Sequence, residues 1–222
     1  MITKELQKRL LSSIILIPIT IFFIFQETLF FVFFLCILFI ATSYEWIKMN
    51  KRNVLKIIGI VYIFFAFILA YFLREKFSLG LFILVLIICI LTDLGGFIFG
   101  KFFKGPKLIK ISPKKTYTGA VGSFILSLVG GLIYIKYLSS SYSLYFNLSI
   151  LTDVALGEMY YLLILIISLI SQIGDLIISY FKRLAKVKDT GNILPGHGGL
   201  LDRIDGIIFA IPASYLLFYY LI

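Results

Sequence analysis

One polar stretch of the sequence, KVKDTGNILPGHGGLLDRIDG at residues 186–206, carries residue types that can bind metals and phosphates. It holds the only histidine of the chain, His197, together with Asp189, Asp202 and Asp205. Since the last two aspartates are three residues apart, a helix would place both carboxylates on one face, where they could share a divalent cation. The structural alternative is that they cap the start of a helix, which stabilises it by about 0.5–2 kcal/mol.

A second set of polar residues lies in the preceding stretch, SQIGDLIISYFKRLAK at residues 171–186. On a helix, Asp175, Ser179, Lys182 and Lys186 fall on one face, because their offsets of four, seven and eleven residues match the helical repeat. A carboxylate with cations two and three turns further along suits a site that binds Mg²⁺ and a polyphosphate. The alternative is an intramembrane salt bridge with lysines that reach the interface.

A third set begins with Asp93, a carboxylate inside an otherwise apolar run, where a charge costs about 2.5–3.5 kcal/mol on insertion scales. Charges at such places usually face a cavity or a partner. Six lysines follow, and hydroxyl, ammonium and backbone N–H groups could bind phosphate at Ser112, Lys114, Lys115 and Thr116. The alternative is a basic loop in which Ser112 caps the next helix and Pro113 lies in its first turn.

Together these residues indicate phosphoryl or nucleotidyl transfer, in which catalysis depends mainly on positioning and on stabilising charge. Carboxylates favour Mg²⁺, and no cluster of Cys and His residues indicates zinc. The predicted metal ligands are Asp175, Asp202 and Asp205, and Gly198 and Gly199 are expected to let a ligand approach the backbone. The sequence has no nucleophile elbow and no Walker loop, which gives little support to nucleophilic catalysis or a Walker-type nucleotide site.

The composition places these residues in a membrane protein. Hydrophobic residues make up 61% of the 222 residues and charged residues 14%, with a mean hydropathy of +1.06, whereas soluble domains are about half apolar and about a quarter charged. Lipid cannot satisfy a free backbone, so the expected fold is all-α. Apolar stretches predict seven transmembrane helices, at residues 10–25, 28–47, 54–73, 77–99, 118–138, 159–181 and 204–222.

Basic residues predict the orientation of these helices, because cytoplasmic loops are enriched in Lys and Arg. With seven spans, the side of the N-terminus receives 18 of the 21 basic residues and the other side receives three. The N-terminus is therefore expected in the cytoplasm and the C-terminus outside. The segment 139–158 then forms an outer loop with a short interfacial helix. We expect one membrane domain, with N-terminal helices in residues 1–90 and the catalytic region in residues 91–222.

Two blocks of the sequence resemble the signature of the phosphatidate cytidylyltransferases, the CDP-diacylglycerol synthases. The first runs from Ser179 to Asp205 and contains KR at 182–183, KD at 188–189, LPGHGG at 194–199 and DRID at 202–205. The second is Asp93 with the glycines after it, followed by SPKKT at 112–116. The resemblance is strong over about the last 130 residues, while the first 90 match only as hydrophobic helices.

The resemblance implies that the protein transfers a cytidylyl group from CTP to phosphatidate, giving CDP-diacylglycerol and pyrophosphate. It implies Mg²⁺ with a K⁺ ion beside it, a homodimer, and a multi-pass protein of the inner (plasma) membrane whose active site faces the cytoplasm. CTP, phosphatidate and the lipid bilayer are the expected partners, and nucleic acid is not. The implied catalytic residues are Asp175, Lys182, Arg183, Lys188, Asp189, His197, Asp202, Arg203 and Asp205. The implied substrate-binding residues are Asp93, Ser112, Lys114, Lys115, Thr116, Ser179, Gly198 and Gly199.

In this scheme the lysines and arginines neutralise the triphosphate and the lipid phosphate, and His197 either assists the departure of pyrophosphate or orders the loop. Three features depart from the family pattern. Thr118 stands where members usually have Glu, and LGGF at 94–97 stands where many have an Ala-Tyr or Ala-Phe pair. The chain is also expected to lack one or two N-terminal helices of longer members. The signature itself is complete.

Two other functions share parts of this pattern. A CTP-dependent polyprenol or lipid kinase would use similar charges but transfer a phosphoryl group. A secondary transporter for an anionic solute is a further alternative, because broken helices and charges near the membrane centre are typical of transporters. The two halves of the sequence show no internal symmetry, and the charges gather toward one face, which favours an enzyme.

Overall fold

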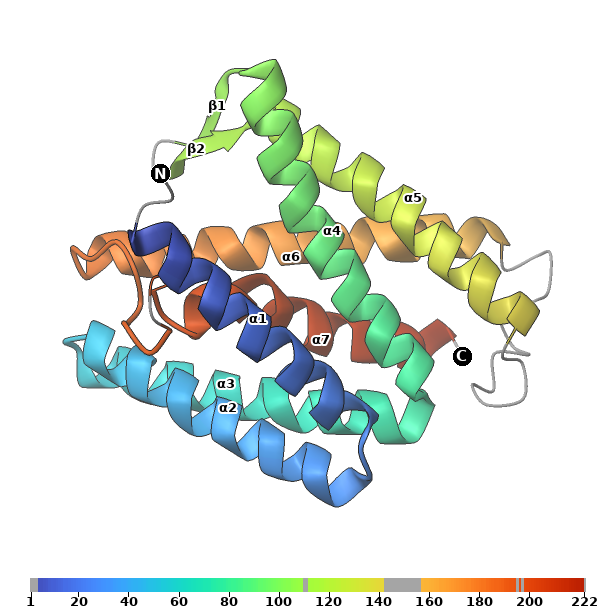
Figure 1. The fold of residues 1–222 in the computed structure, drawn as a ribbon, viewed down its shortest axis with the longest axis horizontal. Coiled ribbons are helices and arrows are strands. Elements are labelled where there is room, and N and C mark those ends of the chain that lie inside the picture. The colour runs from blue at the N-terminus through green and yellow to red at the C-terminus, as the bar shows by residue number, and fades with distance from the viewer. Residues whose placement is uncertain (1–3, 110–111, 142–156, 195, 197, 222) are drawn as a thin grey trace. The chain divides into compact units, whose positions relative to one another are not determined.

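The computed structural model describes residues 4–109, 112–141, 157–194, 196 and 198–221. This part of the chain folds into seven α-helices, which confirms the predicted all-α class (Figure 1). Their bounds are α1 Lys4–Phe25, α2 Thr28–Met49, α3 Asn53–Phe72, α4 Leu79–Phe103, α5 Tyr117–Ser141, α6 Gly157–Leu184 and α7 Leu201–Leu221. A π-helical turn, Leu73–Phe77, follows α3, and two short strands, β1 (Lys107–Ile109) and β2 (Ser112–Thr116), lie between α4 and α5.

Five helical segments among the described residues are long and apolar enough to cross a membrane: Thr28–Met49, Asn53–Phe77, Leu79–Phe103, Tyr117–Lys136 and Met159–Leu184. The apolar part of α1, Ile14–Phe25, is shorter. The last helix, α7, is not among these five segments, and it begins with the charged run DRID at 202–205. The chain is therefore a multi-pass membrane protein. Its orientation in the membrane, which the basic residues predict on the assumption of seven spans, stays a prediction.

The chain divides into two compact units, residues 1–67 with 181–204 and residues 68–180 with 205–222. Helices α3, α6 and α7 contribute residues to both units. The predicted division into N-terminal helices and a catalytic region at residue 90 is a different one, and it stays a prediction. Most of the outer loop that we predicted at 139–158, residues 142–156, lies outside the described residues.

In the first unit, aromatic and polar contacts of α2 fix it beside the start of α3 and the end of α6. The indole N–H of Trp46 donates to the carbonyl of Leu55 at 2.9 Å. The side-chain amide of Asn50 donates to the carbonyl of Trp46 at 2.9 Å, at the point where α2 ends. The ring of Phe181 packs edge-on against Trp46, with ring centroids 5.0 Å apart. The end of α6, where the polar loop 185–200 begins, is thereby held against α2.

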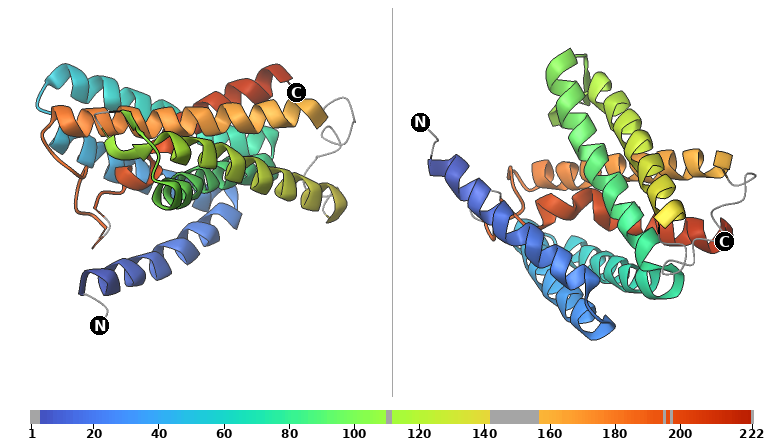
Figure 2. Two further views of the ribbon diagram at one scale, coloured as in Figure 1. Left: turned by 90° about the horizontal axis from the view of Figure 1, so that it is seen from above. Right: turned by 45° about the vertical axis from the view of Figure 1, so that its right-hand side comes forward.

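In the second unit, α4 and α5 lie side by side (Figure 2). Glycines allow their close approach, since a Cβ added to Gly95 would lie 2.4 Å from the carbonyl oxygen of Gly122. The hydroxyl of Ser123 donates to the carbonyl of Thr92 at 2.6 Å, and the hydroxyl of Thr92 donates to that of Ser168 on α6 at 2.8 Å. Small residues and hydroxyl hydrogen bonds are typical of contacts between membrane helices. These contacts fix α4 and α6, which carry Asp93 and Asp175.

The segment between α4 and α5, which we predicted to be a loop, contains an antiparallel β-hairpin of β1 and β2. The alternative prediction for Ser112 and Pro113 is wrong, because both lie in β2 and neither starts the next helix. A residue that precedes proline is restricted to extended conformations, but a strand and an N-cap position both supply these, so the Ser-Pro pair alone does not separate the two. Thr116 caps α5 instead, since its Oγ1 accepts the backbone N–H of Gly119 at 3.1 Å.

Candidate active site

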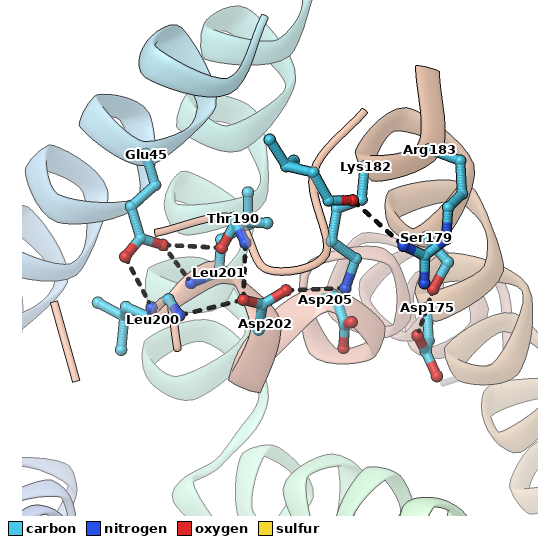
Figure 3. A network of polar contacts seen from close by, with 12 residues as sticks. Glu45, Asp175, Ser179, Lys182, Arg183, Thr190, Leu200, Leu201, Asp202 and Asp205 are labelled. Atoms are coloured by element: carbon cyan, nitrogen blue, oxygen red, sulfur yellow. Dashed lines mark hydrogen bonds and ion pairs between the residues drawn. The ribbon is translucent and has the colours of Figure 1, made fainter. Parts of the chain in front are cut away.

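In the first unit, the carboxylate of Asp202 accepts three hydrogen bonds, from the end of α6 and from two places in the polar loop (Figure 3). Its Oδ1 accepts a hydrogen bond from the ammonium of Lys182 at 2.7 Å. Its Oδ2 accepts the backbone N–H groups of Thr190 at 2.8 Å and of Gly199 at 3.0 Å. The side chains of Lys182 and Asp202 are only 12% and 10% exposed, so the ion pair is nearly buried. Asp202 lies in the first turn of α7, but the N–H groups that it accepts belong to residues before this helix, so it does not cap α7 as the alternative supposed. The carboxylate instead joins the end of α6 to the start of α7.

A buried carboxylate that the sequence prediction did not include, Glu45 of α2, supports the same loop (Figure 3). Glu45 is 1% exposed. Its Oε1 accepts the N–H of Leu200 at 2.9 Å, and its Oε2 accepts the N–H of Leu201 at 2.8 Å and the hydroxyl of Thr190 at 3.1 Å. The sequence did carry a signal, because Glu45 is the only acidic residue in the apolar stretch 28–47. The same criterion had singled out two of the aspartates.

Packing within the loop accounts for both signature glycines. Gly199 is buried, and an added Cβ would lie 2.0 Å from Thr190 Oγ1 and 2.6 Å from Glu45 Oε2. Gly198 has a φ of +86°, which residues with a side chain disfavour. Its carbonyl accepts the N–H of Leu194 at 3.0 Å. Since these contacts explain glycine at both positions, substrate binding by Gly198 and Gly199 stays a prediction.

Replacing Gly199 by alanine is expected to destabilise the protein by about 1–3 kcal/mol, because the added methyl group would displace Thr190 and Glu45. The measurement is thermal unfolding of the purified protein in detergent, where the midpoint should fall. Asn192→Ala, at an exposed position of the same loop, is the matched control and should leave the midpoint unchanged. An unchanged midpoint in Gly199→Ala would contradict the close packing of this loop.

In the second unit, the carboxylate of Asp175 on α6 forms an ion pair with the ammonium of Lys115 on β2. Ser179, one turn further along α6, donates its hydroxyl to Asp175 Oδ1 at 3.3 Å, in agreement with the predicted helix face. Both side chains of the ion pair are 26% exposed, so the pair is accessible from outside the protein. The hairpin therefore brings one end of the SPKKT segment to the carboxylate of α6.

The remaining predicted site residues differ in exposure. Asp205 is 7% exposed, and its Oδ1 accepts the N–H of Gly206 at 2.9 Å. Lys114 lies in β2 by its backbone, and His197 lies outside the described residues. The exposed members are Asp93, Arg183, Lys188, Asp189 and Arg203.

The predicted site residues are divided between the two units. Those in the first unit are Lys182, Arg183, Lys188, Asp189, Gly198, Gly199, Asp202 and Arg203. Those in the second unit are Asp93, Ser112, Lys114, Lys115, Thr116, Asp175, Ser179 and Asp205.

Thr118, which stands where the resembling family usually has Glu, connects α5 to the end of α4. Its Oγ1 accepts the backbone N–H of Gly105 at 3.2 Å and lies 3.0 Å from the Oγ1 of Thr116. Gly105 packs closely against this side chain, since an added Cβ would lie 2.5 Å from Thr118 Cγ2. Threonine therefore has a structural role at this position, because it holds the hairpin from which Lys115 reaches Asp175.

The carboxylates fit Mg²⁺ by their chemistry and by the cations that they already hold. Asp175 pairs with the ammonium of Lys115, and Asp202 pairs with that of Lys182, so each carboxylate accepts a cation in this structure. Among the described residues, no group of three His, Cys, Asp or Glu side chains could hold a metal ion. Mg²⁺ commonly uses only one or two carboxylates together with substrate phosphates. The sharing of one ion by Asp175, Asp202 and Asp205 stays a prediction.

Comparison with known proteins gives consistent matches over most of the chain. Residues 52–221 match the model of the cytidylyltransferase family. The chain is 35% identical over 220 residues to the phosphatidate cytidylyltransferase of Rickettsia typhi, with 96% of this chain and 91% of that protein covered. It is 37% identical over 228 residues to that of Rickettsia prowazekii, covering 98% and 94%. With that of Staphylococcus aureus it shares 35% over 184 residues, covering 81% and 65%. The similarity therefore extends well beyond the last 130 residues.

Proposed function

The chain belongs to the cytidylyltransferase family, and from this premise we propose that it transfers the cytidylyl group of CTP to phosphatidate, giving CDP-diacylglycerol and pyrophosphate. Similarity to phosphatidate cytidylyltransferases over nearly the whole chain supports this pair of substrates. The observation that carries the proposal is the signature loop, which Lys182 and Asp202 close. This closure leaves the cationic side chains of Arg183, Lys188 and Arg203 exposed, where they can bind phosphates.

In the proposed reaction, a phosphate oxygen of the lipid attacks the α-phosphorus of CTP. The bond between the α-phosphorus and the oxygen that joins it to the β-phosphorus breaks, and pyrophosphate leaves with that oxygen. The attacking oxygen is already anionic near neutral pH, so the protein needs no strong base. The main obstacle is the repulsion between two polyanions, which cationic side chains reduce. Arginine is well suited to this role because its guanidinium can bind two phosphate oxygens through parallel hydrogen bonds. We assign phosphate binding to Arg183, Lys188 and Arg203.

We further propose that Asp175, Asp202 and Asp205 contribute the ligands of Mg²⁺, which would supply charge stabilisation at the α-phosphorus. The partners of two of these carboxylates support the assignment, because Lys115 and Lys182 occupy them with positive charge. The ammonium of Lys115 can leave Asp175 and bind a substrate phosphate, since it pairs with either anion. Asp175 is then available to Mg²⁺. The K⁺ ion and the homodimer that the resemblance implies remain expectations without assigned residues.

The proposed site opens to the cytoplasm, where CTP is dissolved, while phosphatidate enters from the bilayer. The excess of basic residues on the predicted cytoplasmic side supports this orientation. It also places the positively charged loops where they can attract CTP. We propose the inner (plasma) membrane of the cell as the location.

The test is turnover by the purified protein in mixed micelles that contain phosphatidate, with CTP and Mg²⁺ added. We expect a CDP-lipid and an equal amount of pyrophosphate, and no product when CTP, phosphatidate or Mg²⁺ is omitted. Formation of CDP in place of pyrophosphate would identify a CTP-dependent kinase. Flux of an anionic solute into sealed vesicles without any nucleotide product would identify a transporter. Either result would overturn the proposal.

A further inference from the structure

We propose that Glu45 is a positioning residue of the active site: from α2, its carboxylate holds the signature loop and the start of α7 in the geometry that binds CTP. The inference rests on the proposed cytidylyl transfer and deepens it, because it assigns a role to a residue outside the sequence signature. Glu45 lies in the part of the chain that had resembled the family only as hydrophobic helices.

The contacts of Glu45 are those of an ionised carboxylate. Its two oxygens accept hydrogen bonds from the N–H groups of Leu200 and Leu201 and from the hydroxyl of Thr190. A carboxylate that is 1% exposed is unfavourable unless donors such as these satisfy it. Two of the donors lie where α7 begins, and the helix dipole favours a negative charge there. The surroundings therefore suit the charge of Glu45 and not only its size.

Glu45 and Asp202 accept hydrogen bonds from adjacent donors of the same loop, which couples their positions (Figure 3). Thr190 gives its hydroxyl to Glu45 at 3.1 Å and its backbone N–H to Asp202 at 2.8 Å. Gly199 gives its N–H to Asp202 at 3.0 Å, while the next two residues give theirs to Glu45. A displacement of Glu45 must therefore move the donors that fix Asp202, the carboxylate that pairs with Lys182.

The loop also encloses Glu45 sterically. A Cβ added to Gly191 would lie 2.6 Å from Glu45 Oε1, and one added to Gly199 would lie 2.6 Å from Glu45 Oε2. Real Cβ atoms do not come this close to an oxygen, so only residues without a side chain can approach the carboxylate on both sides. The signature glycine at 199 therefore serves the contact with Glu45, which links α2 to the signature directly.

The substitution Glu45→Gln removes the charge with little change in shape. The amide oxygen can still accept a backbone N–H, and the amide nitrogen can donate to the hydroxyl of Thr190. The nitrogen cannot accept the second backbone N–H, so one amide at the start of α7 loses its partner. We expect kcat/KM for CTP to fall about 10–100-fold, the range seen when outer-shell partners of metal ligands are removed. The change should appear mainly in the KM for CTP and less in the KM for phosphatidate.

Matched variants separate this role from a general loss of folding. Glu27→Gln, at an exposed residue just before α2, is the control and should keep wild-type kinetics. Thr190→Ser keeps the hydroxyl that Glu45 accepts and should retain the activity that Thr190→Val loses. In the double variant Glu45→Gln/Thr190→Val, the loss should be smaller than the product of the single losses, because Thr190→Val removes a hydrogen bond that Glu45→Gln already weakens by taking away its charge. Rates are normalised to the folded fraction, and the Thr190 pair decides the question if Glu45→Gln does not fold.

Amide hydrogen exchange at Leu200 and Leu201 provides a readout that does not depend on catalysis. Exchange should be faster in Glu45→Gln than in the wild type or in Glu27→Gln. Wild-type exchange with a wild-type KM for CTP would overturn the inference, and so would an activity loss that follows the folded fraction at unchanged KM. If the wild-type protein makes no CDP-lipid, the proposed function fails, and the exchange rates alone then decide whether Glu45 holds the loop.

Discussion

Replacing Asp175 by asparagine is expected to lower the rate of cytidylyl transfer about 10²–10³-fold. The substitution removes the charge that pairs with Lys115 and that would bind Mg²⁺, whose stabilisation of the reacting phosphate amounts to several kcal/mol. About 1.4 kcal/mol corresponds to a factor of ten in rate. Asparagine keeps the size of the side chain and can still accept the hydroxyl of Ser179, so α6 should insert normally. The measurement is kcat for CDP-lipid formation at saturating CTP.

The control for this substitution is Glu75→Gln, because Glu75 forms an ion pair with Arg74 outside the candidate site. It should leave kcat unchanged. Lys115→Met probes the partner of Asp175: without the ammonium that competes for this carboxylate, half-maximal activity should occur at a lower Mg²⁺ concentration. Normal turnover of Asp175→Asn in the folded protein would remove Asp175 from the metal site.

Replacing Lys182 by methionine is expected to destabilise the protein by about 3–5 kcal/mol, because it leaves the nearly buried charge of Asp202 without its cation. Turnover should be lost as well, since the pair closes the signature loop. In the double variant Lys182→Met/Asp202→Asn, part of the stability should return because no charge remains unpaired, while activity should stay low. The measurements are the unfolding midpoint and kcat for Lys182→Met, for Asp202→Asn and for the double variant.

Lys188→Met supplies the comparison for this pair, because Lys188 is an exposed cation of the same loop. It should weaken phosphate binding and thereby raise the KM for CTP, while stability changes by less than about 0.5 kcal/mol. Additive losses of stability in Lys182→Met, Asp202→Asn and their combination would show that the ion pair does not hold the loop together.

The helices were predictable because lipid imposes a simple requirement on each of them. A run of about 20 apolar residues must form a helix in a bilayer, and the predicted stretch 28–47 corresponds to α2, Thr28–Met49. The hairpin of β1 and β2 was not predictable in this way. Its strands are short and rich in lysine, and they pair through backbone hydrogen bonds that leave no pattern of side chains. Ser112 before Pro113 indicates extended backbone, but an N-cap position is extended too, so this pair did not single out a strand.

The candidate site was predictable where its residues lie on one helix. The spacing of Asp175 and Ser179 gave their contact, because residues four apart are neighbours on a helix. Contacts between separate elements, such as those of Asp175 with Lys115 and of Lys182 with Asp202, depend on tertiary packing. Glu45 shows the limit most clearly, since its partners lie 145 to 156 residues away along the chain. No local pattern can connect such distant positions. An isolated acid in an apolar stretch does, however, indicate a residue with a partner, and Glu45 is such an acid.

Transfer of the α-phosphorus of CTP is the direct signature of a cytidylyltransferase. The decisive measurement is incubation of the purified protein with phosphatidate, Mg²⁺ and CTP labelled at either the α- or the γ-phosphate, followed by separation of lipid from water-soluble products. We predict that label from the α-phosphate appears in the lipid and that label from the γ-phosphate appears in pyrophosphate. Label that reaches the lipid only from the γ-phosphate would contradict cytidylyl transfer and would identify a kinase.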